Sequence, residues 1–183
     1  MVVKVMSQRL FIGIRPPTVV RQALMDTMKG LEGARWQGDE QLHLTLRFIG
    51  EADRDVANDL AAALACIVMP SFKLELDGVS HFDRKGIPTA IWARVPPTPD
   101  LQRLRTRVEH ACELVGLGCE ARHFTPHITI ARLPRYAGPI ADWLAQNIGL
   151  SFSWQAEGFT LFESHLLESG AQYEVIKHYR SVD

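Results

Sequence analysis

Two short segments of this sequence carry the same arrangement of a histidine and a threonine. His43 and Thr45 lie in the tetrapeptide HLTL, and His127 and Thr129 lie in the tetrapeptide HITI in the second half of the chain. Side chains two residues apart in a β-strand project from the same face, so each histidine is expected beside its threonine. If the two strands face each other, two imidazoles and two hydroxyls meet around a volume the size of a phosphate group.

This combination of groups suits the hydrolysis of a phosphodiester without a metal ion. The reaction needs a base that deprotonates the attacking water and an acid that protonates the leaving alkoxide, and each contributes about 10²–10⁴-fold. An imidazole can take either role near neutral pH. Threonine hydroxyls and a nearby arginine would stabilise the phosphoryl oxygens. A five-membered cyclic phosphate is a suitable substrate, because opening the ring relieves strain.

Histidines on strands also have structural uses, and a single His-x-Thr segment is more often a surface pair or a buried, hydrogen-bonded histidine. Two copies on alternating strands favour the catalytic interpretation. A zinc site would need a third ligand beside His43 and His127, and the nearby Glu120 and His123 form no recognised metal spacing. No metal or other cofactor is therefore expected, while His123 is a candidate for bordering the site. The other histidines have no threonine two residues later and are expected at the surface or in turns: His81, His110, His165 and His178.

The segments that carry the two motifs have the alternation of half-buried strands. Residues 41–49 place leucines and Phe48 on one face and polar side chains on the other, and residues 125–131 alternate in the same way. The aliphatic side chains on the reverse face would hold the polar face rigidly against a core.

The rest of the pattern predicts about seven strands interleaved with two or three long helices, which is typical of an α/β or α+β sandwich. Prolines and glycines mark the ends of several of these elements. Further strands are expected at residues 9–14, 72–79, 89–95, 152–162 and 173–179, and helices at residues 17–28, 53–69, 98–114 and 140–148.

The composition is that of an ordinary globular protein. The chain has 183 residues, which fits one domain, with 46% hydrophobic and 22% charged residues. With 20 basic and 21 acidic side chains the formal net charge is −1, which argues against binding along a nucleic-acid duplex but allows recognition of one terminal nucleotide by a few arginines.

The sequence also indicates where the protein works. Its apolar stretches are too short to span a bilayer, and its first residues lack the pattern of a secretory signal. The three cysteines, Cys66, Cys112 and Cys119, are widely spaced and support neither a disulfide framework nor a zinc ribbon. No membrane association and a cytoplasmic location are therefore expected.

Around the two motifs the sequence resembles the 2H phosphoesterase superfamily, and within it the bacterial and archaeal RNA 2′,3′-cyclic phosphodiesterases, which are also called 2′-5′ RNA ligases. The resemblance extends over nearly the whole chain. The similar segments are residues 9–14 (RLFIGI), 34–36 (ARW), 43–50 (HLTLRFIG), 124–126 (FTP), 131–132 (AR) and 162–164 (FES), followed by Tyr173. The resemblance implies a bilobal α+β fold with two similar antiparallel sheets, flanked by helices, around a central cleft. Residues 1–183 would form one such domain with two pseudo-symmetric lobes.

The resemblance also implies roles for particular residues. His43 would be the general acid that protonates the ribose 3′-oxygen, and His127 the general base that activates water. Thr45 and Thr129 would hold the phosphoryl oxygens. Arg132 would contact the phosphate, although its parity is opposite to that of His127 on an ideal strand, so a bulge or strand end must turn it inward.

Phe48 and Arg47 are weaker candidates for contact with the nucleoside. Phe48 shares its parity with Leu44 and Leu46, which favours a place in the core.

The expected partners are RNA ends or oligonucleotides with a 2′,3′-cyclic phosphate, tRNA fragments among them, and small cyclic nucleotides. Hydrolysis would leave a 2′-phosphate, and the reverse reaction would join RNA ends through a 2′-5′ linkage. The protein is expected to be a monomer. Two alternatives stay open: a phosphodiesterase for small cyclic nucleotides derived from ADP-ribose, and a module that binds RNA ends without cleaving them. A pure binder needs no acid and base, so the two intact motifs disfavour the second alternative.

Overall fold

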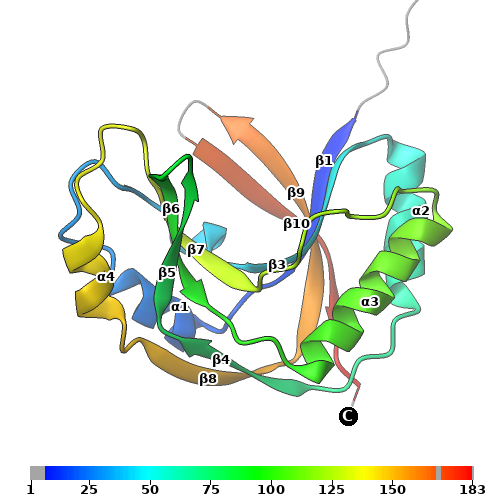
Figure 1. The fold of residues 1–183 in the computed structure, drawn as a ribbon. Helices are drawn as coiled ribbons and strands as arrows, with labels where there is room; N and C mark the ends of the chain where they lie inside the picture. The colour runs from blue at the N-terminus through cyan, green and yellow to red at the C-terminus, as the bar shows by residue number, and fades with distance from the viewer. Residues whose placement is uncertain (1–6, 168–169, 183) are drawn as a thin grey trace, which may run out of the picture.

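The computed structural model describes residues 7–167 and 170–182, and most of its strands belong to one antiparallel sheet. These strands are β1 (Gln8–Ile14), β2 (Arg35–Trp36), β3 (Leu44–Ala52), β5 (Val79–Arg84), β6 (Ile87–Arg94), β7 (His127–Arg132), β9 (Gly158–Leu167) and β10 (Gly170–Arg180). Their order is β10-β9-β1-β3-β7-β6-β5, and β2 pairs with β7 (Figure 1). A separate two-stranded sheet contains β4 (Phe72–Asp77) and β8 (Ser151–Ala156). The predicted antiparallel α+β fold is confirmed.

Helices pack beside both ends of the large sheet (Figure 1). They are α1 (Thr18–Met25), α2 (Arg54–Ala65), α3 (Pro99–Leu114) and α4 (Ala141–Asn147), with a 3₁₀ turn η1 (Asp39–Gln41). Helices α2 and α3 pack against each other and against β1, β3 and β10, while α1 contacts β8 and α4 contacts β5. The two long helices begin where capping residues allow: the side chains of Asp53 and Thr98 accept hydrogen bonds from the amides of Val56 and Leu101. No helix of the described residues has the length and apolar character needed to cross a membrane.

The two halves of the large sheet, each with one motif strand, meet along a very short ladder. Within the described residues β3 and β7 pair at Leu44 and Ile128, and both side chains are completely buried. Among the described residues the ladder does not continue beyond this pair, and the polar faces of the two motif strands border a hollow whose lining includes Thr45 and His127. The fully buried side chains of Leu44 and Ile128, on the reverse of the polar faces, anchor the junction of the two strands in the core.

Several predicted elements differ from those observed. The strand predicted at residues 72–79 divides at Gly78, which has φ 74° and whose added Cβ would lie 2.7 Å from the Ile148 carbonyl oxygen. The strand predicted at residues 152–162 divides into β8 and β9, and the helix predicted to reach residue 69 ends at Ala65. Strands β2 and β5 were not predicted. Their sequences are short or lack regular alternation, and they exist because neighbouring strands pair with them.

Candidate active site at the junction of the sheet halves

The pairing of β3 with β7 brings the two His-x-Thr motifs together. When the antiparallel register is continued one residue to either side of the joining pair, His43 lies opposite Thr129 and Thr45 lies opposite His127. In this register each histidine faces the threonine of the other half. The proximity of the two imidazoles is also evident in their electrostatics, since a charge on His127 lowers the pKa of His43.

His43 is held by a backbone carbonyl and enclosed by aromatic rings. Its Nδ1 donates to the carbonyl oxygen of Gln41 at 2.7 Å, since a carbonyl can only accept. The proton is thus placed on Nδ1, and Nε2 is left to exchange a proton with a substrate. The ring centroids of Phe11, Tyr173 and Phe162 lie 4.7, 5.2 and 6.2 Å from that of His43.

This enclosure changes the charge of His43. Burial is the main cause that lowers its pKa to about 4, against the opposing effect of the Gln41 carbonyl. The positive charges of His127 and Arg132 lower the pKa further. The imidazole of His43 is therefore neutral at pH 7 when the cleft holds no anion.

His127 has an equivalent environment in the other half of the sheet. Its Nδ1 donates to the carbonyl oxygen of Thr125 at 2.6 Å, again two residues earlier in the chain. The rings of Phe82 and Trp92 lie 4.9 and 5.5 Å from its centroid. Burial is the main cause of its lowered pKa, the Thr125 carbonyl opposes the shift, and the charge of Arg132 adds to it. Both histidines thus present the same nitrogen to the cleft.

Each motif strand has a register irregularity one residue after its threonine, and this decides which later side chains reach the cleft. Thr45 and Arg47 of β3 pair with Gly13 and Ile12, which are consecutive residues of β1. Leu46 between them has no partner and is an extra residue. In β7, Ile130 is the extra residue in the pairing with β6. A β-bulge of this kind reverses the side-chain alternation that follows it.

The bulge in β3 overturns the expectation from strict alternation. Phe48 is 49% exposed and lines the cleft, so its predicted place in the core is wrong. Arg47 turns inward and is 8% exposed. It donates to the Gly118 carbonyl and lies 3.6 Å from Glu109 and 3.4 Å from Glu120, which ties the segment after α3 to β3.

The bulge in β7 supplies the inward turn that Arg132 requires. Ile130 and Ala131 are both completely buried, and Arg132 is exposed on the face of Thr129. The charge of Arg132 lowers the pKa of His43 and of His127. It also opposes the rise that burial causes in the pKa of Tyr173. A cation that acts on all three groups makes the cleft favourable for an anion.

A hollow of about 240 Å³ adjoins His127 and Thr45. Phe48, Phe82 and the segment before β7 form its walls, with Arg105, Glu120, Arg122, His123 and Phe124 among the lining residues. His123, a candidate for bordering the site, is thus part of the lining of this hollow. The guanidinium of Arg122 lies 5.8 Å from the Phe48 ring centroid and that of Arg105 4.8 Å from the Phe124 ring centroid.

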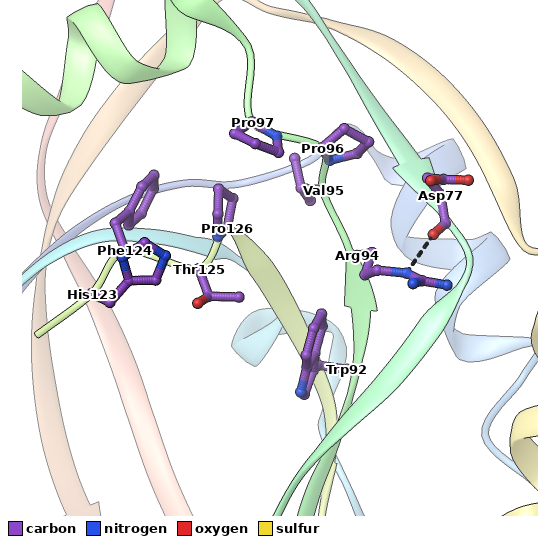
Figure 2. Close-up of a pocket in the computed structure, with 10 residues that line it drawn as sticks. All are labelled: Asp77, Trp92, Arg94, Val95, Pro96, Pro97, His123, Phe124, Thr125 and Pro126. Carbon is purple, nitrogen blue, oxygen red and sulfur yellow. Dashed lines mark hydrogen bonds between the residues drawn. The ribbon is translucent and has the colours of Figure 1, made fainter.

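A larger hollow of about 350 Å³ has residues 123–126 in its lining and neither motif histidine (Figure 2). Pro96, Pro97 and Phe124 give it apolar walls. Arg94 donates from Nε to the backbone oxygen of Asp77 at 2.9 Å. We place the candidate site in the smaller hollow and the adjoining cleft, because the groups that can do chemistry are there.

Several aromatic residues around the histidines were not among the site residues expected from the sequence. The aromatic rings next to the imidazoles come from four strands distant in sequence, and periodicity gives no signal for such contacts. They are Phe11, Phe82, Phe162 and Tyr173. Three of them lie in or next to segments that carry the family resemblance, which is the one signal that could have drawn attention to them.

Comparisons with known proteins agree with this geometry. The model of the 2′-5′ RNA ligase superfamily matches residues 16–167. The RNA 2′,3′-cyclic phosphodiesterase of Thermus thermophilus is 31% identical over 182 residues, which cover 93% of this chain and 89% of the relative. The protein of that name from Thermotoga maritima is 29% identical over 174 residues, 92% of each chain. A crystal structure described as a phosphoesterase superposes with a TM-score of 0.83 at 26% identity, covering 97% of this chain and all of that one. Escherichia coli LigT complexed with 3′-AMP shares the fold, with a TM-score of 0.79 at 24% identity and coverage of 97% and 100%.

Proposed function

Because this chain belongs to the 2′-5′ RNA ligase superfamily, we propose that it is an RNA 2′,3′-cyclic phosphodiesterase that opens a terminal cyclic phosphate to a 2′-phosphate. The curated relatives that match over nearly their whole length carry this name. The observation that carries the proposal is the meeting of the two motifs across the β3–β7 ladder. It supplies two proton-transfer groups, two hydroxyl donors and the Arg132 cation on one face.

The proposed reaction uses one histidine on each side of the phosphorus atom. Nε2 of His127 accepts a proton from water as the water oxygen forms a bond to phosphorus. The bond between phosphorus and the ribose 3′-oxygen breaks, and Nε2 of His43 gives that oxygen its proton. Thr45 and Thr129 donate hydrogen bonds to the phosphoryl oxygens, and Arg132 balances the charge that develops on them. The assignment of acid and base follows the family resemblance.

His43, the proposed acid, must be protonated for the reaction, whereas burial favours its neutral form in the free site. With its pKa near 4, His43 is mostly neutral at pH 7. A bound cyclic phosphate places a negative charge beside the ring and raises its pKa, since an opposite charge within about 4–6 Å favours the charged form. Substrate binding therefore helps to produce the protonation state that the reaction needs.

Activity in the absence of metal ions is the direct test of the proposal. Purified protein with EDTA should hydrolyse 2′,3′-cyclic nucleotides and oligoribonucleotides with a cyclic end, with the product phosphate on the 2′-oxygen by ³¹P NMR. His43→Ala and His127→Ala should each lower kcat by about 10²–10⁴-fold, the usual contribution of a positioned acid or base. His110→Ala, an exposed histidine on α3, is the control and should keep full activity. Undiminished turnover in either motif variant would refute the proposed roles.

The chemistry of the substrate beyond the phosphate is also a proposal. The half-exposed Phe48 ring, with the Arg122 guanidinium above it, supports binding of a nucleoside next to His127. RNA ends, including tRNA fragments, and small cyclic nucleotides fit this description. By microscopic reversibility the same site would join RNA ends through a 2′-5′ linkage. Comparing kcat/KM for mononucleotides, longer RNAs and ADP-ribose-derived cyclic nucleotides separates these substrates.

We further propose that the whole chain acts as one domain, as a monomer, in the cytoplasm. The support for one domain is that each half of the large sheet contributes one histidine, so neither half alone would hold the complete site. Light scattering coupled to size-exclusion chromatography tests the monomer, and cell fractionation tests the location.

A further inference from the structure

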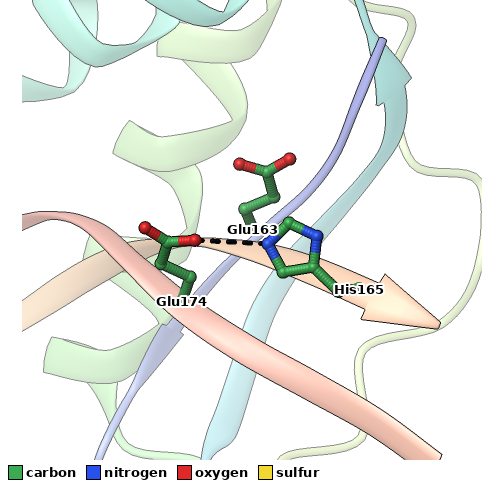
Figure 3. Close-up of side chains that lie close together, drawn as sticks. All are labelled: Glu163, His165 and Glu174. Atoms are coloured by element: carbon green, nitrogen blue, oxygen red, sulfur yellow. Dashed lines mark hydrogen bonds and ion pairs between the residues drawn. The ribbon is translucent and has the colours of Figure 1, made fainter. Parts of the chain in front are cut away.

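Three side chains that commonly bind metal ions gather on β9 and β10, outside the catalytic cleft (Figure 3). Glu163 and His165 lie two residues apart on β9, and Glu174 lies on the adjacent strand. One ligand atom from each lies within 4.8 Å of the other two. His165 Nε2 and Glu174 Oε2 are 3.3 Å apart. In the described part of the chain this is the one group of three or more such residues with that geometry.

The group lies on the opposite face of the strands from the cleft. Glu163 and His165 continue the alternation of Phe159 and Leu161, which are in the core. The other face of the same strands presents aromatic rings to His43, including that of Tyr173. The three ligands are therefore separate from the motif histidines, and the strands between them link the two places.

The ladder between β9 and β10 places two glutamates directly opposite each other. Glu163 and Glu174 are Cα partners in this antiparallel pair. Like charges in this position are destabilising, and the structure shows Glu163 half-buried rather than fully solvated. A divalent cation between the carboxylates would remove the repulsion at any pH at which they are ionised.

A neighbouring amide holds one of these carboxylates in place. Gln8 on β1 donates from Nε2 to Glu163 Oε2 at 2.8 Å. Carboxylates that ligate metals are usually oriented by such a hydrogen bond from a residue outside the ligand set. Glu163 thus keeps its other oxygen available on a side chain whose position is already restrained.

We propose that Glu163, His165 and Glu174 bind Zn²⁺. One imidazole nitrogen and two carboxylate oxygens are ligands that zinc accepts, and three protein ligands leave the fourth tetrahedral position for water. Bonds of about 2.0–2.1 Å in a tetrahedron separate neighbouring ligand atoms by roughly 3.3–3.4 Å. His165 Nε2 and Glu174 Oε2 already have that separation, at 3.3 Å. The ligand atom of Glu163 lies within 4.8 Å of both.

The bound ion would act on stability and not on the hydrolysis proposed above. It would connect β9 to β10 across the reverse of the strands that enclose His43. Because binding to the folded state alone stabilises it by mass action, Zn²⁺ should raise the unfolding temperature. Hydrolysis of the cyclic phosphate should proceed with EDTA, so the metal site and the proposed function can fail independently.

Calorimetric titration of untagged, EDTA-stripped and desalted protein with ZnCl₂ tests the site. The wild-type chain should bind one equivalent, and Co²⁺ in place of Zn²⁺ should give the visible absorption of a tetrahedral complex. Gln8→Ala should weaken binding by about 10–100-fold, as loss of an orienting partner does, and His165→Ala or Glu174→Gln should weaken it further. His110→Gln is the matched control, since it removes an exposed histidine 4.0 Å from the single carboxylate of Glu113, and should bind as wild type does.

The unfolding temperature at pH 8, with and without Zn²⁺, gives a second readout that separates a metal site from contacts that need no ion. With EDTA, Glu174→Gln should unfold at the same or a higher temperature than wild type, because one of two opposed charges is gone. With Zn²⁺ the order should reverse. The proposal is overturned if wild-type protein takes up no Zn²⁺, or if His165→Ala binds as tightly as wild type. It is equally overturned if His127→Ala abolishes uptake while His165→Ala retains it, since the ion would then occupy the cleft.

Discussion

At the scale of single residues, the two histidines are prepared in the same way. Each donates Nδ1–H to the carbonyl two residues before it, and each has a pKa lowered chiefly by burial. The tautomer and orientation are thereby set before a substrate arrives. Arg132 adds a cation that disfavours protonation of both rings in the free site and attracts the anionic substrate.

These pKa shifts predict the pH dependence of catalysis. If the reaction needs protonated His43 and neutral His127, kcat/KM reports these groups in the free enzyme. Both have pKa values below the ordinary 6.5, so the bell-shaped profile of kcat/KM should be centred below pH 6.5. On the alkaline side of this profile kcat/KM should fall as the pH rises, because His43 loses its proton.

Arg132→Gln should lower activity and move the remaining profile to higher pH, because one positive charge that lowers both pKa values is gone. Arg103→Gln changes an exposed arginine that pairs with Asp100 on α3 and should leave the profile unchanged. A profile of Arg132→Gln centred at the wild-type pH would contradict the electrostatic role assigned to this side chain.

At the scale of secondary-structure elements, the two bulges are the decisive feature. Leu46 and Ile130 occupy equivalent positions, one residue after the threonine of each motif. Each extra residue reverses the alternation and turns a side chain five positions after the histidine, Phe48 or Arg132, to the cleft. A regular strand with the same sequence would bury Phe48 and leave Arg132 on the wrong face.

Replacement of Phe48 by alanine distinguishes these two arrangements. With the bulge, Phe48→Ala should cost little stability and lower kcat/KM for cyclic nucleotides and RNA by about 5–150-fold, since stacking of a base on an aromatic ring is worth roughly 1–3 kcal/mol. In a regular strand the loss of a buried phenylalanine would cost about 3–5 kcal/mol of unfolding free energy. Phe159→Ala, which removes a ring that is 1% exposed, provides the buried comparison in urea unfolding. Equal destabilisation by the two variants would show that Phe48 is in the core.

At the scale of the whole molecule, the proposed site depends on how the halves of the sheet meet. Each half provides one histidine with its own aromatic enclosure, and the short β3–β7 ladder sets the distance between them. A small change at this junction would move the two proton-transfer groups relative to each other. Displacements of about 1 Å are enough to lower a rate by about 10²-fold.

Leu44→Ala tests this dependence, because the removed side chain is completely buried at the joining pair. The substitution should destabilise the protein by about 2–5 kcal/mol and also lower kcat of the folded fraction. Leu74→Ala removes an equally buried leucine from β4, in the separate sheet. It should cost similar stability in urea unfolding but leave kcat of the folded fraction near that of wild type. Equal kcat values for the two variants would mean that the junction does not position the motifs.

The sequence by itself determined the two motifs, most of the strands that carry them and the residues at which the two long helices begin. These features are local: alternation depends on residues two apart, and a cap depends on a side chain three residues from the amide it binds. Only the tertiary structure decided the bulges after Thr45 and Thr129, the aromatic surroundings of His43 and the opposition of Glu163 to Glu174. Each of these depends on the register between strands that are distant in the chain, and register is fixed by packing of the whole core.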